Sequence, residues 1–309
     1  MRRLTFLFLI ALGGTAAGLA QSINEVPWAR DVKQAIALAQ RTKRPLLFYV
    51  TASREDRDNN LEHAQARAMA DPKVQRWMHQ FVLVRLSRSA NRDILEQVGL
   101  HEAANMEMSF TAPDGKKLDA LSAGGVAQKD SLLRKLQLVF NAYGQMMFDS
   151  ELRPILVKQD ATPKELREPL QRIQEFHITG ADTYVAQLLD RAGLDKQTTD
   201  LCYAVLAALS TKASVDKLVE RSGQNDRAAT AALAKCTPAG AQLMLAHLVD
   251  KEGFIRLDVY KAVMQICGMK DRKSDRWWEQ AKENSLRDEI ERVKREVTEV
   301  AEQWKRENE

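Results

Sequence analysis

The stretch PLLFYV, residues 45–50, decides the fold of the first half of the chain. It is a short apolar run rich in residues that favour β-strands. A helical pattern precedes it over residues 27–41, with an apolar face made of Val32, Ala35, Ile36 and Ala39. A helix followed at once by a buried strand indicates an α/β arrangement for this part of the chain.

The segments that follow alternate between helix and strand. One or two helices are expected over residues 60–80, with a break at Asp71-Pro72 because proline starts a helix better than it continues one. Further strands are expected over residues 81–86, 106–111 and 117–121. Pro113-Asp114-Gly115 is a turn signal between the last two strands. A closing helix over residues 129–141 would complete a small α/β sandwich.

This order of elements resembles the thioredoxin-like family over residues 27–143. Two matching features are a helix that is led by Trp28 and ends in Lys43-Arg44-Pro45, and the strand over residues 81–86. The others are two short sequence segments, Asp71-Pro72-Lys73-Val74 and Ala112-Pro113-Asp114-Gly115-Lys116. Their order and spacing make the resemblance, which implies a thioredoxin-like domain over residues 21–143.

The redox site of that family is missing from this sequence. The family places a Cys-x-x-Cys pair after the first long strand, where a helix N-terminus stabilises the reactive thiolate. Here residues 51–58 are TASREDRD, and no cysteine occurs before Cys202. The family also places a cis-proline before its third strand, where this chain has Met106 or a neighbour. The resemblance therefore implies the fold without the redox activity.

Other chemistry at residues 53–56 (SRED) is not expected. A serine nucleophile needs a base and an oxyanion hole, and His63 would lie more than a helical turn further on. The segment is interpreted as an N-cap and first helical turn. The five histidines lack the spacing of metal ligands: His63, His79, His101, His177 and His247. No catalytic residue, cofactor-binding residue or metal ligand is predicted, and no cofactor is expected.

The second half of the chain is predicted to be helical. Residues 144–162 form a looser linker, expected to pack because it contains Met146, Met147 and Phe148. Strand signals vanish from Pro163 onward. Three similar helical segments cover residues 203–209, 227–233 and 257–263, each followed by a second amphipathic helix. They resemble HEAT-type repeats and imply a helical repeat domain over residues 163–284; an ordinary helical bundle is the alternative.

Three cysteines, Cys202, Cys236 and Cys267, lie within these helices. They are interpreted as small buried core residues. Disulfides between equivalent repeat positions are not expected, since stacked helix axes lie about 8–10 Å apart and a disulfide needs Cα atoms within about 7 Å.

The tail over residues 285–309 is a long charged helix. Its apolar residues alternate steps of four and three, like a coiled-coil seam: Leu286, Ile290, Val293, Val297, Val300 and Trp304. The helix is expected to cap the open end of the repeats, and the alternative is a partner-binding or dimerising helix.

The first 20 residues have the three parts of a secretory signal peptide. Arg2 and Arg3 precede an apolar run over residues 4–12, and small residues lead to a cleavage site after Ala20. The protein is therefore expected to be exported, to the periplasm or the extracellular medium. No later segment is apolar enough to span a membrane, and basic and acidic residues are interleaved, so nucleic acid is not expected as a partner.

Two functions follow from these observations. The first is an exported, non-catalytic interaction or scaffold protein built on a redox-inactive thioredoxin-like domain, with a protein as its partner. The alternative is an enzyme related to thiol-disulfide oxidoreductases, or a hydrolase, with a non-standard active site. The sequence identifies neither the partner nor the oligomeric state.

Overall fold

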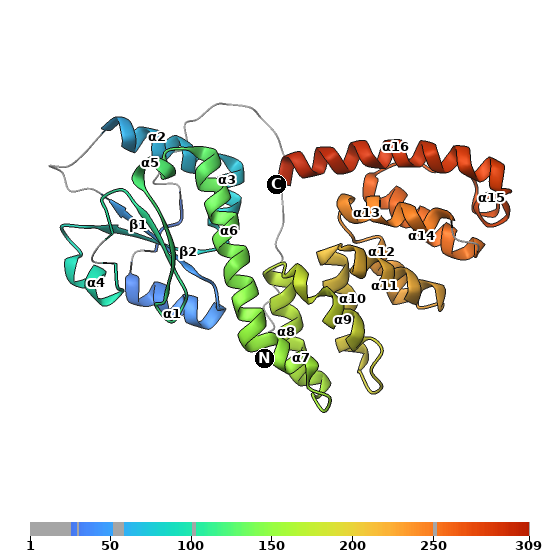
Figure 1. Cartoon of the computed structure of the whole chain (residues 1–309), viewed down its shortest axis with the longest axis horizontal. Coiled ribbons are helices and arrows are strands. Elements are labelled where there is room, and N and C mark those ends of the chain that lie inside the picture. Colours follow the sequence, from blue (N-terminus) through green and yellow to red (C-terminus); the bar gives the residue numbers. More distant parts are fainter. Residues whose placement is uncertain (1–25, 30, 52–58, 101–102, 250–251, 309) are drawn as a thin grey trace, which may run out of the picture.

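The computed structural model describes residues 26–29, 31–51, 59–100, 103–249 and 252–308. The expected signal peptide, its cleavage site and the segment 53–56 lie outside the described residues. Figure 1 shows a mixed α/β part in blue and green, followed by a helical part that runs from green to red. The predicted combination of an α/β part with an all-α part is confirmed at this level.

The α/β part is built on a four-stranded mixed sheet in the order β2-β1-β3-β4. The strands are β1 (Leu46–Thr51), β2 (Val82–Ser87), β3 (Met108–Thr111) and β4 (Lys117–Leu121). β1 pairs in parallel with β2 from Leu46↔Val82 onward, and antiparallel with β3. β3 and β4 form an antiparallel hairpin. The expected third strand begins two residues late because Met106 has a φ of 63°, which is outside the extended region.

Both faces of β1 are buried because helices cover both faces of the sheet (Figure 1). Leu46, Phe48 and Val50 pack with α1 (Val32–Thr42) and α4 (Arg92–Gln97). Leu47 and Tyr49, which alternate with them, belong to the core on the opposite face. The helices of that face are α2 (Asn59–Met69), α3 (Pro72–Met78), α5 (Ala123–Val126) and α6 (Lys129–Met147).

The break predicted at Asp71-Pro72 is confirmed. Asp71 is the N-cap of α3, and its carboxylate accepts hydrogen bonds from the backbone N–H groups of Lys73 at 2.9 Å and Val74 at 3.4 Å. Pro72 occupies the first helical position, where its missing N–H costs nothing because that group has no partner within the helix.

The expected loose linker over residues 144–162 is mostly helical instead. α6 continues to Met147, a π-helical turn η2 covers Phe148–Leu152, and α7 covers Arg153–Val157. Phe148, Leu152 and Leu156 are buried at steps of four residues, so one continuous helical face packs on the core. Only residues 158–162 lie outside a helix before α8 begins.

The remaining helices form an array beside the α/β part (Figure 1), in which helices close to one another in the chain pack together. Their bounds are α8 (Pro163–Glu175), η3 (Thr179–Ala181), α9 (Asp182–Leu188), α10 (Lys196–Leu209), α11 (Lys212–Gly223), α12 (Arg227–Leu233), α13 (Pro238–Met244), η4 (Leu245–Val249), α14 (Gly253–Cys267), α15 (Asp275–Gln280) and α16 (Glu283–Asn308). None of the helices in the described ranges combines the length and apolar character needed to cross a bilayer.

A series of aromatic rings connects the sheet to the helical part. Phe110 of β3 contacts Phe81 at a centroid distance of 5.5 Å, and Phe81 contacts Phe140 of α6 at 5.9 Å. Phe140 stacks on Phe176 at 5.2 Å, and Tyr143 meets Phe176 edge-on at 5.9 Å. One hydrophobic core therefore extends from the sheet into the helical part.

The tail forms the single helix α16, which packs along α13, α14 and η4. Leu286, Ile290, Val293 and Val297 are buried as the seam predicts, but the next buried residue is Ala301. A second step of four, from Val297 to Ala301, is typical of a straight helix with 3.6 residues per turn. The predicted step of three to Val300 would be typical of a supercoiled helix. The end of α16 returns to α3, where Arg76 donates a 2.7 Å hydrogen bond to Asn308.

Candidate functional site

In the thioredoxin-like family, which the sequence resembles, the redox site follows the first long strand. The corresponding position in this chain is the end of β1. β1 ends at Thr51, and residues 52–58 lie outside the described residues, so the structure does not place Ser53. His63 lies on α2 and is exposed. Met106 occupies the turn before β3, and its N–H donates to the carbonyl of Val50 at 2.6 Å.

A buried glutamine organises this end of the sheet. Gln65 is fully buried on α2, and its amide nitrogen donates to the carbonyls of Met106 at 3.0 Å and Ala123 at 2.8 Å. Its amide oxygen accepts a 2.5 Å hydrogen bond from the Tyr49 hydroxyl. Burial raises the pKa of Tyr49 to about 12, so the hydroxyl keeps its proton at neutral pH. The network joins β1, α2, α5 and the turn before β3.

Sequence reasoning did not single out Gln65, although a signal was present. Leu61, Gln65, Ala68 and Met69 have the spacing of one helical face, and Gln65 is the polar residue among apolar ones. A polar side chain on an apolar face must find hydrogen-bond partners when it is buried.

Two of the three cysteines are buried core residues, as expected, and Cys267 is only partly buried. Cys202, Cys236 and Cys267 are free, and the first two are buried. Burial raises the pKa of the Cys202 thiol to about 12 and those of Cys236 and Cys267 to about 11. Thiols of this kind are protonated at neutral pH, whereas nucleophilic attack on a disulfide needs the thiolate.

The histidines are scattered over the molecule. His247 Nε2 lies 3.0 Å from the carboxylate of Asp216, and His177 has its pKa lowered by burial. His101 lies outside the described residues. Within the described ranges, no three His, Cys, Asp or Glu side chains gather in a way that could hold a metal ion.

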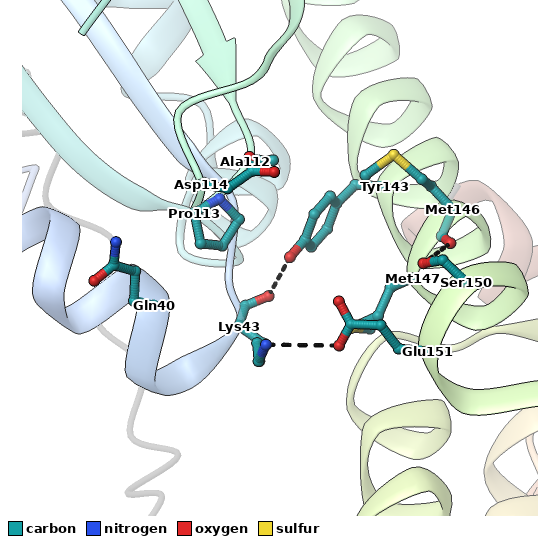
Figure 2. Close-up of a pocket in the computed structure, with 10 residues that line it drawn as sticks. All are labelled: Gln40, Lys43, Ala112, Pro113, Asp114, Tyr143, Met146, Met147, Ser150 and Glu151. Atoms are coloured by element: carbon teal, nitrogen blue, oxygen red, sulfur yellow. Dashed lines mark hydrogen bonds and ion pairs between the residues drawn. The ribbon is translucent and has the colours of Figure 1, made fainter. Parts of the chain in front are cut away.

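A pocket of about 210 Å³ lies where α1 ends, beside the β3–β4 turn and the junction of α6 with η2. Figure 2 shows Tyr143 of α6 directed toward the end of α1, where its hydroxyl donates to the Lys43 carbonyl at 2.9 Å. The Lys43 ammonium lies 3.6 Å from the Glu151 carboxylate. Arg172 of α8 donates to the neighbouring Thr42 carbonyl at 2.8 Å.

These contacts show that the residues around the pocket connect the end of α1 to α6, η2 and α8. The last carbonyls of a helix have no partner within that helix, and here side chains of α6 and α8 supply hydrogen-bond donors. Burial raises the pKa of Tyr143, which keeps its hydroxyl a donor. The pocket is smaller than the range of about 300–1,000 Å³ that is typical of ligand sites.

A larger groove of about 610 Å³ lies between α12 and α14. Each helix contributes one face with the spacing i, i+3, i+4, i+7. The residues are Arg227, Thr230 and Ala231 from α12 with Ala234 directly after it, and Asp258, Lys261, Ala262 and Gln265 from α14. Ser222 and Asn225, at the end of α11 and in the loop that follows it, complete the lining. This groove, which we call the α12–α14 groove, is the candidate functional site.

Hydrogen bonds hold the two sides of the groove in place. The Ser222 hydroxyl donates to the Asp258 carboxylate at 2.9 Å and lies 2.8 Å from the Thr230 hydroxyl. Lys261 forms an ion pair with Asp275 at 2.6 Å. The arrangement presents charged, hydroxyl and amide groups that can bind polar ligands.

Comparison of this chain with protein-family models, with curated proteins and with solved structures gave no match.

Proposed function

We propose that this protein is an exported, non-catalytic interaction protein in which a thioredoxin-like domain without redox cysteines precedes a HEAT-like helical repeat. The single observation that carries the proposal is the α12–α14 groove, an open surface that two neighbouring helices of the helical part line with polar side chains and alanines. Stacked helix pairs present extended surfaces of this kind to their binding partners.

The sheet supports the thioredoxin-like part of the proposal. Its order β2-β1-β3-β4, with parallel β1 and β2 and a terminal β3–β4 hairpin, agrees with the order of elements on which the resemblance rests. Helices on both faces complete a three-layer α/β sandwich.

The helical part supports the repeat assignment. α10 contacts α11, and α11 contacts both α12 and α13. α11 and α13 each follow a threonine N-cap, Thr211 and Thr237. Short capped helices in a regular order are what a stack of helix pairs needs.

The thiols argue against redox activity. Cys202, Cys236 and Cys267 lie on or after helices of the repeat part, and burial raises the pKa of each thiol. The protein is expected to leave insulin disulfides intact in the presence of a reductant. Turnover that disappears when all three cysteines are changed to serine would refute the non-catalytic proposal.

Two further measurements test the interaction and the export. Cross-linking of the mature protein in its own envelope fraction should yield a discrete complex with a second protein, and the absence of any complex would contradict the proposal. The mass of the exported protein should correspond to a chain that starts at Gln21; a mass that retains Arg2 and Arg3 would contradict cleavage after Ala20.

A further inference from the structure

The α12–α14 groove contains a cation without a partner among the described residues. Arg227 is exposed at the start of α12, and within the described residues its side chain makes no hydrogen bond or ion pair. The other cation of the groove, Lys261, is already paired with Asp275. The Asp258 carboxylate is held by Ser222 on the opposite side. An acidic group of a ligand can therefore pair with Arg227, at a distance from the Asp258 carboxylate, which is bound only by a neutral hydroxyl.

The centre of the groove is lined by alanines. Ala231 lies on α12, Ala234 directly follows that helix, and Ala262 lines the groove from α14. Side chains this small leave room for a polypeptide backbone to approach the helices closely. Asn225 and Gln265 lie at the rim, both are exposed, and neither side chain has a hydrogen-bond partner among the described residues. An amide side chain offers both a donor and an acceptor, as a peptide group requires.

Other classes of ligand fit these groups less well. Nucleic acids and anionic lipid surfaces are bound by several cations, and this groove combines one free cation with the Asp258 carboxylate. Small-molecule sites are enclosed and mostly apolar, whereas this groove is lined by charged, hydroxyl and amide side chains along with its alanines.

We propose that the α12–α14 groove binds an extended peptide segment that carries an acidic side chain opposite Arg227. The proposal rests on the interaction function proposed above and specifies the partner at that site. The peptide backbone lies over Ala231 and Ala234, with Asn225 and Gln265 bonding to its peptide groups.

The experiment selects peptides from a random phage-displayed library on the full-length mature protein. Selected peptides, labelled with fluorescein, are then titrated with the protein and followed by fluorescence anisotropy. We expect the selected peptides to share an Asp or Glu. Arg227→Glu should weaken their binding about tenfold, because an attractive ion pair becomes a repulsive one. A peptide with Lys in place of the shared acid should bind this variant better than it binds the wild type.

Two further variants make the test specific to the groove. Lys235→Glu changes the charge by the same amount at an exposed position that does not line the groove. The affinity of this variant for the selected peptides should stay within about twofold of the wild-type affinity. Ala231→Trp fills the groove at an exposed position, so it should abolish binding without disturbing the core. Thermal melts of all variants check that they are folded.

Three results would overturn the proposal. These are selected peptides without a shared acid, equal weakening by Arg227→Glu and Lys235→Glu, and a library that yields no binder. In each case the cross-linked complex decides separately whether the protein interacts through another surface, so failure of the groove proposal is distinct from failure of the interaction function.

Discussion

Phe176 is the residue through which the α/β part and the helical part should be most strongly coupled. It is about 1% exposed, stacks on Phe140 at 5.2 Å with an interplanar angle of 17°, and meets Tyr143 edge-on. A Cβ placed on Gly144 would lie 3.5 Å from its Cβ, so α6 passes close beside it. Phe176→Ala would remove the ring from between two parts of one core.

The expected cost follows from these contacts. Truncation of a buried phenylalanine to alanine costs about 3–5 kcal/mol, and the upper part of that range applies where neighbours cannot close the cavity. The lost ring pairs contribute about 1 kcal/mol of this amount. We therefore expect Phe176→Ala to lower the free energy of unfolding by about 4 kcal/mol, a large share of a usual margin of about 5–15 kcal/mol.

Urea unfolding measures this cost and the coupling together. Trp28 and Trp77 report on the α/β part by fluorescence, and Trp277, Trp278 and Trp304 report on the helical part. Wild-type protein should unfold in one transition, because one core connects both parts. Phe176→Ala should unfold in two, and single-tryptophan versions assign each transition to its part.

Phe254→Ala is the matched control, because Phe254 is 41% exposed on α14. It should change the free energy of unfolding by no more than about 1 kcal/mol. A similar small effect for Phe176→Ala, or two transitions already present in the wild type, would refute the idea that the aromatic series couples the two parts.

Four other outcomes are expected. Gln65→Leu should cost about 2–4 kcal/mol in chemical denaturation because it leaves buried polar groups without partners; a neutral effect would show that the network is dispensable. Burial raises the pKa of the Cys202 thiol to about 12 in the folded protein. The buried neutral thiol therefore stabilises the fold fully below the unfolded pKa of about 8.5, and this stabilisation is lost as the pH rises from there toward the folded pKa. Cys202→Ala should make the free energy of unfolding fall less steeply at alkaline pH, and an unchanged alkaline unfolding curve would contradict this expectation. Deletion of residues 285–309 should lower the free energy of unfolding by several kcal/mol, because apolar side chains of α16 and of the helices beneath it lose their burial. The full-length protein should sediment as a monomer. A full-length dimer that becomes a stable monomer on deletion would instead indicate a dimerising helix. Trypsin should cleave after Lys158, which lies outside the helices, before it cleaves at sites inside α6 to α7, and early cleavage within those helices would indicate a loose linker after all.

The sequence by itself determined the elements whose cause is local. The apolar run over residues 45–50 predicted β1, because β-forming residues buried on both faces leave a continuous apolar pattern. Asp71-Pro72 predicted the start of α3, because a carboxylate cap and a proline act within one turn. Pro113-Asp114-Gly115 predicted the hairpin turn, where Gly115 has a φ of 88° that suits glycine.

Only the tertiary structure decided which distant residues meet. Phe148, Leu152 and Leu156 have helical spacing in the sequence, but only their burial against the core shows that the segment over residues 144–157 is helical and not a looser linker. The α12–α14 groove brings together residues about thirty positions apart, such as Arg227 and Asp258. Periodicity marks the face of one helix, but the pairing of two faces depends on how the whole stack buries its apolar surface, so tertiary packing created this groove.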